Sequence, residues 1–229
     1  MIRRALAEGL GTAFLVAAVV GSGVAASRLS PTDTGLQLLE NAIATAAALA
    51  AIILALGPVS GAQLNPVITL IDLALGGLSG RTAAAYIAAQ IGGGAIGAAV
   101  ANAMFSLPPA FATRARAGGG LWLGEVIATL GLVIIVFGVA RGGRAAAAPY
   151  AVAAYIGGAY FFTSSTSFAN PAVTISRALS DSFAGIAPGS VPGFIVAQLA
   201  GGALGLLLVR ILYPRSASAA PAAVAPHQS

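Results

Sequence analysis

Two long stretches without a charged residue constrain this chain most strongly, because each carries nearly the same tripeptide close to its end. The stretches are residues 41–71 and 145–176. Their tripeptides are Asn65-Pro66-Val67 and Asn170-Pro171-Ala172. Asn is a strong helix N-cap and Pro suits the first helical position, so each tripeptide predicts a helix start. One membrane crossing needs about 20 apolar residues and two need roughly 40. Each stretch therefore predicts one full crossing followed by a short helix that begins near the membrane midplane.

The backbone between the crossing and the short helix must turn at membrane depth. Such irregular backbone is tolerated only where protein or a water-filled cavity surrounds it, and discontinuous helices of this kind mark substrate paths. We therefore expect the two Asn-Pro sites to meet inside the membrane, beside a path for a solute.

The composition places the chain in a lipid bilayer. Of its 229 residues, 58% are hydrophobic and only 7% are charged, so a soluble fold would lack polar surface. The basic residues are 11 arginines at the ends of apolar segments, which indicates membrane topology rather than a nucleic-acid partner. Cysteine is absent and the one histidine, His227, lies in the tail, so we expect no disulfide, no metal site and no cofactor.

Six membrane crossings can be placed along the chain. Their approximate ranges are 5–26, 38–56, 83–105, 121–140, 149–163 and 191–213. The first could instead be a signal peptide, but it is longer than the usual apolar region of ~7–15 residues and contains Glu8, so we expect it to be retained. The loop 106–120 separates two repeats, about 1–105 and 121–213, within a single domain of residues 1–215. Residues 216–229 are predicted to form a disordered cytoplasmic tail.

An internal repeat relates the two halves. The matched features are Glu8 and Thr12 with Glu125 and Thr129, the two Asn-Pro pairs, and residues 90–97 (Gln-Ile-Gly-Gly-Gly-Ala-Ile-Gly) with 198–205 (Gln-Leu-Ala-Gly-Gly-Ala-Leu-Gly). Each half holds three crossings, an odd number, so the repeats are inverted and their short helices enter from opposite faces. The glycines of the last pair predict close helix crossings within one subunit.

The arginines indicate which end of the molecule is cytoplasmic. One side would hold Arg3, Arg4, Arg81, Arg141, Arg144, Arg210 and Arg215, and the other would hold Arg28, Arg114 and Arg116. By the positive-inside rule, both termini are expected in the cytoplasm.

The two short helices also predict what can pass between them. Their N-termini place positive dipole ends at the midplane, and the Asn amides can donate hydrogen bonds to a solute. Cations and protons should be repelled, whereas a neutral solute with oxygen lone pairs can exchange water hydrogen bonds for these donors. An isolated Asn-Pro is usually only a turn or a helix start, but two copies in inverted repeats favour a pore.

Together these residues resemble the aquaporin and aquaglyceroporin family. The resemblance rests on residues 60–67 (Ser-Gly-Ala-Gln-Leu-Asn-Pro-Val), residues 168–172 (Phe-Ala-Asn-Pro-Ala), the two Glu-x-x-x-Thr pairs and the two Gln-x-x-Gly-Gly repeats, and it covers residues 3 to about 213. It implies an all-α membrane protein with six transmembrane helices and two re-entrant half-helices. It also implies a homotetramer in the inner (plasma) membrane, with one passive pore per subunit and no enzyme activity.

The positions that set solute size in this family differ here from the usual pattern. Family members carry Arg directly after the second signature, where this chain has Val173. The family's spacing places the other filter positions at Thr45, Gly158 and Ser167. Such a filter would be wide, uncharged and partly apolar.

Three further residues depart from the pattern or stand close to it. Val67 replaces the usual Ala of the first signature, and Gln63 replaces the usual His. Arg177 lies two helical turns past Asn170, and we expect it to face the outer end of the half-helix rather than replace the missing guanidinium.

The filter resembles that of bacterial aquaglyceroporin-like channels associated with arsenic resistance. This implies passage of small neutral solutes: glycerol-like polyols, arsenite and methylated arsenicals, with water as a further candidate. A water-selective variant and a proton-coupled secondary transporter stay open as alternatives.

The transporter would need an intramembrane carboxylate, and Glu8 and Glu125 are the candidates. Each stands four residues before a threonine, Thr12 or Thr129, on the same helical face. This symmetric placement favours a structural role, in which the two carboxylates, the two threonines and Gln63 support the re-entrant loops.

Overall fold

The computed structural model describes residues 1–214, and these residues form helices and connecting loops without a strand. The α-helices are α1 (Ile2–Leu29), α2 (Thr34–Ser60), α3 (Pro66–Ala74), α4 (Gly80–Met104), α5 (Gly119–Arg141), α6 (Ala148–Phe162), α7 (Pro171–Arg177) and α8 (Val191–Leu212). Two 3-10 turns, η1 (Ala145–Ala147) and η2 (Pro188–Ser190), lead into α6 and α8. Six helices in this part of the chain are long and apolar enough to cross a membrane, so the predicted fold class is confirmed. The predicted tail, residues 216–229 with His227, lies outside the described residues.

The first two helices are longer than their apolar cores. α1 begins at Ile2 and includes Arg3, Arg4 and Arg28, and α2 begins directly after Asp33, whose side chain accepts a hydrogen bond from the backbone N–H of Leu36 at 2.9 Å. Charged side chains at helix ends can reach the membrane interface, so the helix continues where the apolar pattern stops.

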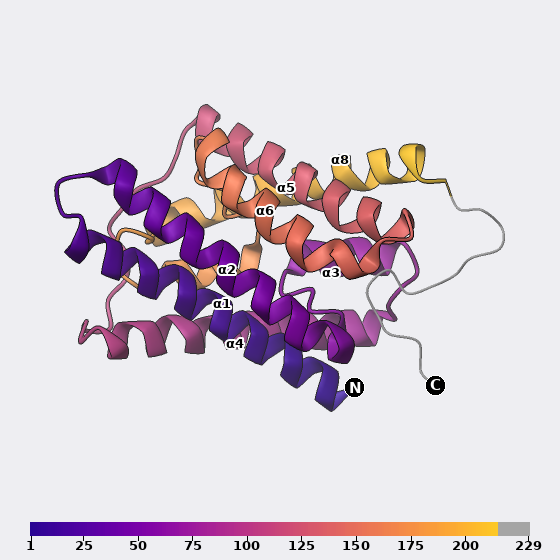
Figure 1. Cartoon of the computed structure of the whole chain (residues 1–229), viewed down its shortest axis with the longest axis horizontal. Coiled ribbons are helices and arrows are strands. Elements are labelled where there is room, and N and C mark those ends of the chain that lie inside the picture. The colour runs from indigo at the N-terminus through magenta and orange to yellow at the C-terminus, as the bar shows by residue number, and fades with distance from the viewer. Residues whose placement is uncertain (215–229) are drawn as a thin grey trace.

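The crossing helices form one bundle whose two halves pack in the same way (Figure 1). In the first half α1 lies against both α2 and α4, and in the second half α5 lies against both α6 and α8. The halves meet where α2 packs on α6. α1 begins and α8 ends at the same end of the bundle, as six crossings require (Figure 1).

Two close helix crossings depend on glycine. A Cβ added to Gly93 of α4 would come within 2.0 Å of the backbone oxygen of Gly9, and one added to Gly201 of α8 would come within 2.3 Å of the backbone oxygen of Val126. Both contacts are inside one chain, between α1 and α4 and between α5 and α8. The predicted intrasubunit packing of the glycine repeats is therefore confirmed.

The short helices α3 and α7 begin as the Asn-Pro pairs predict. The Asn65 side chain accepts a hydrogen bond from the backbone N–H of Val67 at 2.9 Å. The Asn170 side chain does the same for Ala172 at 3.0 Å and Val173 at 3.3 Å. Each Pro occupies the first helical turn, where no N–H is needed.

The loops that lead into these two helices share an unusual backbone. At four, three and one residues before each Asn the φ angle is positive: Gly61 (93°), Ala62 (45°) and Leu64 (53°) in one loop, and Thr166 (63°), Ser167 (51°) and Ala169 (48°) in the other. Non-glycine residues rarely adopt this conformation, and it persists only where surrounding contacts hold it. The same strained path in both loops shows that the two halves repeat one structure.

Candidate functional site

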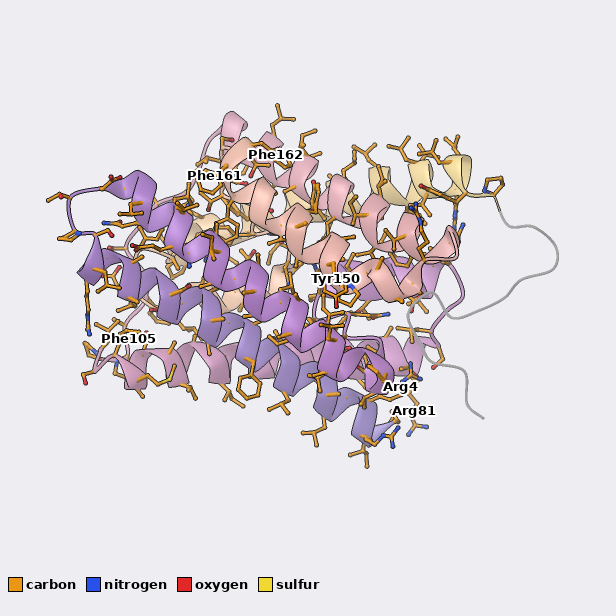
Figure 2. The ribbon with its side chains drawn as sticks, in the orientation of Figure 1. Arg4, Arg81, Phe105, Tyr150, Phe161 and Phe162 are labelled. Atoms are coloured by element: carbon orange, nitrogen blue, oxygen red, sulfur yellow. The ribbon has the colours of Figure 1, made fainter. Side chains whose placement is uncertain are left out.

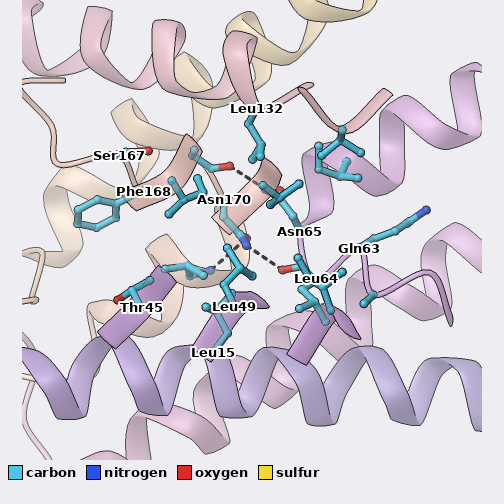
Figure 3. Close-up of a pocket in the computed structure, with 18 of the residues that line it drawn as sticks. Leu15, Thr45, Leu49, Gln63, Leu64, Asn65, Leu132, Ser167, Phe168 and Asn170 are labelled. Atoms are coloured by element: carbon cyan, nitrogen blue, oxygen red, sulfur yellow. Dashed lines mark hydrogen bonds between the residues drawn. The ribbon is translucent and has the colours of Figure 1, made fainter. Parts of the chain in front are cut away.

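The N-terminal ends of α3 and α7 meet at the centre of the bundle. The Asn65 side-chain amide donates to the backbone oxygen of Ala169 at 2.7 Å, and the Asn170 amide donates to the backbone oxygen of Leu64 at 2.7 Å (Figure 3). Each amide has a second hydrogen that these bonds do not use. The two Asn residues thus tie the loops together and keep one donor each for another partner.

A narrow cavity of about 80 Å³ runs past both Asn side chains, with room for a few water-sized molecules. Figure 3 shows Thr45, Ser167 and Phe168 on one side of the Asn pair and Gln63 on the other. Most of the remaining wall is aliphatic; it includes Leu15, Leu49, Ile53, Ile68, Leu132 and Val136. Pro66, Val67, Pro171 and Ala172 are buried behind the Asn residues and do not line the cavity.

Glu8 holds the first loop from behind. It is fully buried, and its carboxylate accepts hydrogen bonds from the backbone N–H groups of Gln63 (2.9 Å) and Leu64 (2.6 Å). The Ser60 hydroxyl (2.7 Å) and the Gln90 amide (2.8 Å) also donate to it. Four donors surround the two oxygens, so the carboxylate is fully used in holding the first loop, which is a structural role.

Glu125 holds the second loop in the matching way. Its carboxylate accepts from the backbone N–H groups of Phe168 (2.8 Å) and Ala169 (2.9 Å) and from the side-chain amide of Gln198 (2.5 Å). Gln198 also donates to the Thr174 hydroxyl at 2.8 Å. Two successive backbone N–H groups in each re-entrant loop therefore donate to a carboxylate, Glu8 in the first loop and Glu125 in the second.

Sequence reasoning missed part of this network. In the sequence Gln90 and Gln198 stand out only as members of a repeat, yet each joins a carboxylate to the hydroxyl of a threonine four residues past an Asn, Thr69 or Thr174. Their identical place in both repeats was the signal. Thr12 and Thr129 do not support the loops: the Thr12 hydroxyl donates to the backbone of Glu8 at 2.8 Å, and that of Thr129 has no partner among residues 1–214.

Gln63 lies at the end of the cavity opposite Phe168. Its side-chain nitrogen donates to the Asp72 carboxylate at 2.7 Å, while its backbone N–H binds Glu8. Its side-chain oxygen is buried without a partner in residues 1–214. Gln63 therefore both lines the cavity and links the first loop to α3.

Comparison with known proteins decides what this arrangement is. The family model described as "Major intrinsic protein" matches residues 1–168, well over half of the chain. The chain belongs to the major intrinsic protein family. Members of this family are membrane channels, so this protein is a passive channel for small solutes and not an enzyme.

Individual relatives of this major intrinsic protein agree. The chain is 46% identical over 213 residues to "Aquaglyceroporin AqpS" of Rhizobium meliloti (strain 1021), covering 93% of this chain and 91% of that protein. It is 31% identical over 227 residues to "Aquaporin Z" of Rhodopseudomonas palustris, covering 91% and 92%. Among solved structures, the aquaglyceroporin from Plasmodium falciparum has the same fold, with a TM-score of 0.69 at 16% identity over 91% of this chain and 95% of that one.

The cavity wall does not include Gly158, one of the four predicted filter positions. That glycine is exposed on α6, and a Cβ added there would meet nothing within 4 Å. The residues of α6 that line the cavity are Val152, Ile156 and Tyr160, spaced four apart, and Gly158 lies two residues from the last two. Two residues rotate the helix by about 200°, so Gly158 must face the opposite side. Gly158 therefore does not line this cavity, and its place in the filter stays a prediction.

Tyr160 takes the place expected of Gly158. It is buried, lines the cavity, and its hydroxyl donates to the Thr45 hydroxyl at 3.1 Å. Thr45, Ser167 and Val173 line the cavity as well. The channel wall at this level therefore combines two hydroxyl side chains, a valine and a tyrosine ring, and it carries no charge at position 173.

Arg177 lies closer to the channel than we expected. It is only 2% exposed, it lines the same cavity as Val173, and its guanidinium stacks on the Phe168 ring at 3.4 Å from the ring centre. Its Nε also donates to the backbone oxygen of Ala184. The reason is spacing: Arg177 stands four residues after Val173 and so shares its helical face.

Proposed function

We propose that this channel conducts glycerol-like polyols and metalloid hydroxides, including arsenite and methylated arsenicals. The observation that carries the proposal is Val173 in the cavity wall, at the position where the family usually has arginine. Valine removes a fixed fork of donors and a bulky cation from the passage. Solutes broader than water then meet a smaller obstacle.

The chemistry of the wall suits these solutes. Glycerol and arsenite each carry three hydroxyl groups, and Thr45, Ser167 and the two Asn amides offer them hydrogen-bonding partners in the cavity wall. In a methylated arsenical a methyl group replaces a hydroxyl, and Val173 and Phe168 offer it an apolar surface. Moving a methyl group from water to such a surface has no desolvation cost of the kind that a hydroxyl without a partner has. The name of the 46% identical relative, an aquaglyceroporin, supports the same solute class.

The water-selective alternative predicts a different ranking of solutes. Tyr160 narrows the passage relative to a glycine, which favours the alternative, but its hydroxyl is bound to Thr45 and not directed freely into the cavity. Osmotic water flow without polyol uptake would support the alternative and contradict our proposal.

The proton-coupled alternative would need a carboxylate in the cavity wall, and among residues 1–214 no carboxylate lines that wall. The carboxylates of Glu8 and Glu125 are used by donors of the re-entrant loops. Protonating either one would remove an acceptor from a buried N–H.

The decisive experiment measures solute uptake into proteoliposomes. The purified channel, a Val173→Arg variant and empty vesicles would be compared for glycerol, arsenite, methylarsonous acid and water. We expect the wild-type protein to accelerate glycerol and arsenite uptake without saturation and without accumulation against a gradient. If neither solute enters faster than into empty vesicles, the proposal fails.

We also propose that the channel is a homotetramer in the inner (plasma) membrane, with its termini in the cytoplasm. The end of the bundle where α1 begins carries Arg4 and Arg81, whereas Phe105 marks the other end (Figure 2). Large apolar side chains such as Leu10, Phe14, Ile43 and Ile96 are exposed on the outer faces of the helices, as contact with lipid or with another subunit requires. Mass measurement in native detergent micelles and protease protection of a terminal tag test these two statements.

A further inference from the structure

We infer that Arg177 is the charge-selective residue of this channel, one helical turn outside the position where the family usually carries arginine. The inference rests on the proposed function, because it concerns how a passage that lacks a charge at position 173 still rejects cations.

The guanidinium of Arg177 lies at the channel wall. It lines the cavity together with Val173 and Tyr160, although it is only 2% exposed. Its flat face covers the Phe168 ring, and such stacking leaves the edge of the guanidinium with its donors free. Nε is used by the backbone oxygen of Ala184, and within residues 1–214 neither terminal nitrogen has an acceptor. A solute entering from this end would meet those two nitrogens.

The charge of Arg177 is held in place but not neutralised. The carbonyl groups of three successive loop residues, Phe183, Ala184 and Gly185, bind the guanidinium groups of Arg114, Arg177 and Arg116 respectively. No carboxylate in residues 1–214 forms an ion pair with Arg177. Carbonyl dipoles stabilise a cation without cancelling its net charge, so the field of the arginine persists in the cavity.

The neighbouring Arg116 adds to this field. It is 6% exposed, its guanidinium lies 5.1 Å from the centre of the same Phe168 ring, and its Nη2 also approaches the backbone oxygen of Phe183 at 3.3 Å. Burial, followed by the charges of Arg177 and Arg114, lowers the pKa of Arg116 to about 9. The charge of Glu125 acts in the opposite direction on the pKa of Arg116, but it ranks below burial and the two arginines among the causes.

Phe168 is a positioning residue for this group. Its ring contacts two guanidinium groups, those of Arg116 and Arg177. The ring is fixed by an edge contact with Phe194, at 5.0 Å between ring centres. Its backbone N–H is bound by Glu125. The carboxylate that supports the loop thus also fixes the platform on which Arg177 lies.

Urea and guanidinium are the sharpest pair of probes, because they have nearly the same shape and differ in charge. Radiolabelled urea and guanidinium, each at low concentration, would be followed into proteoliposomes containing the wild type, Arg177→Gln, Arg177→Met or Arg177→Lys. Arg28→Gln is the matched control, since it removes one positive charge from the same end of the bundle at an exposed site whose contacts are with Phe105.

The wild type should pass urea and exclude guanidinium. At an effective dielectric constant of about 20, repulsion by a unit charge a few ångströms away lowers the concentration of a cation in the cavity more than tenfold. The ratio of guanidinium to urea uptake should therefore rise at least tenfold in the Gln and Met variants. It should change less than about twofold in the Lys variant, which keeps the charge, and in the Arg28→Gln control.

Several results would overturn the inference. Wild-type protein that admits guanidinium as readily as urea would do so at once, and this measurement needs no variant. The inference would also fail if a neutral variant conducted glycerol and still excluded guanidinium. It would fail as well if the Lys variant admitted as much guanidinium as the neutral variants. Failure of the wild type to pass urea, glycerol and arsenite would instead reject the proposed function.

Discussion

Replacing Glu125 by Gln should destabilise the channel strongly while leaving uptake independent of a proton gradient. Gln has the same shape as Glu but offers one acceptor oxygen in place of two. In Glu125 one oxygen accepts from the backbone N–H of Phe168, and the other accepts from Ala169 and Gln198. The better orientation of the Gln amide keeps the second set and turns its NH2 group toward the N–H of Phe168.

The cost follows from these bonds. A buried N–H without an acceptor costs about 1–3 kcal/mol, and each of the two remaining bonds loses about 1 kcal/mol because its acceptor is no longer charged. The variant should therefore lose about 3–5 kcal/mol of stability. For a chain of this size, that corresponds to a melting temperature lower by roughly 6–20 °C.

Thermal unfolding of the purified protein in detergent measures this shift. Glu40→Gln is the matched control, because the Glu40 carboxylate accepts a single hydrogen bond, from the Ser30 hydroxyl at 2.8 Å. The control should lose no more than about 1 kcal/mol, which is a few degrees. A Glu125→Gln protein that melts within two degrees of the wild type would refute the structural account. So would a stable variant that has lost an uptake driven by protons.

Four other substitutions test the cavity wall. Val173→Arg should slow arsenite and glycerol more than water, because it adds a long side chain to the passage and a second cation near Arg177; equal slowing of all solutes in swelling assays would contradict this. Tyr160→Phe should change the ratio of glycerol to water flux severalfold by freeing the Thr45 hydroxyl, whereas Gly158→Ala should leave that ratio unchanged. A larger effect of Gly158→Ala than of Tyr160→Phe would place Gly158 in the filter. Ser167→Cys should make conduction sensitive to mercury salts, because its side chain lines the cavity, while the wild type, which has no cysteine, stays insensitive.

The centre of the fold was predictable because it depends on local chemistry. An Asn followed by Pro starts a helix whatever surrounds it, and both α3 and α7 begin where those pairs stand. The matched positions of Glu8 and Glu125 likewise indicated contacts with the two loops. The odd number of crossings in each half was enough to predict inverted repeats.

The details in which the cavity wall differs from expectation depend on helix rotation and on loops. Gly158 was placed by counting residues from Asn170, but the intervening loop sets the rotation of α6, and a count along the chain does not contain it. Arg177 was judged from its distance to Asn170, although its spacing from Val173 was the better guide. Its stacking on Phe168 and its bond to Ala184 depend on the folded loop after α7, which no local pattern announces.

The crossed bonds of the two Asn side chains have a consequence for biogenesis. The acceptor of the Asn65 amide is the backbone oxygen of Ala169, which is synthesised 104 residues later. The backbone oxygen of Leu64 likewise has no donor until Asn170 has been synthesised. When the ribosome has delivered only the first three crossings, the re-entrant loop has no partner for these groups. The centre of the passage can therefore be completed only after residues 169 and 170 have entered the bilayer, and a nascent chain arrested before that point lacks the acceptor of Asn65 and the donor to Leu64.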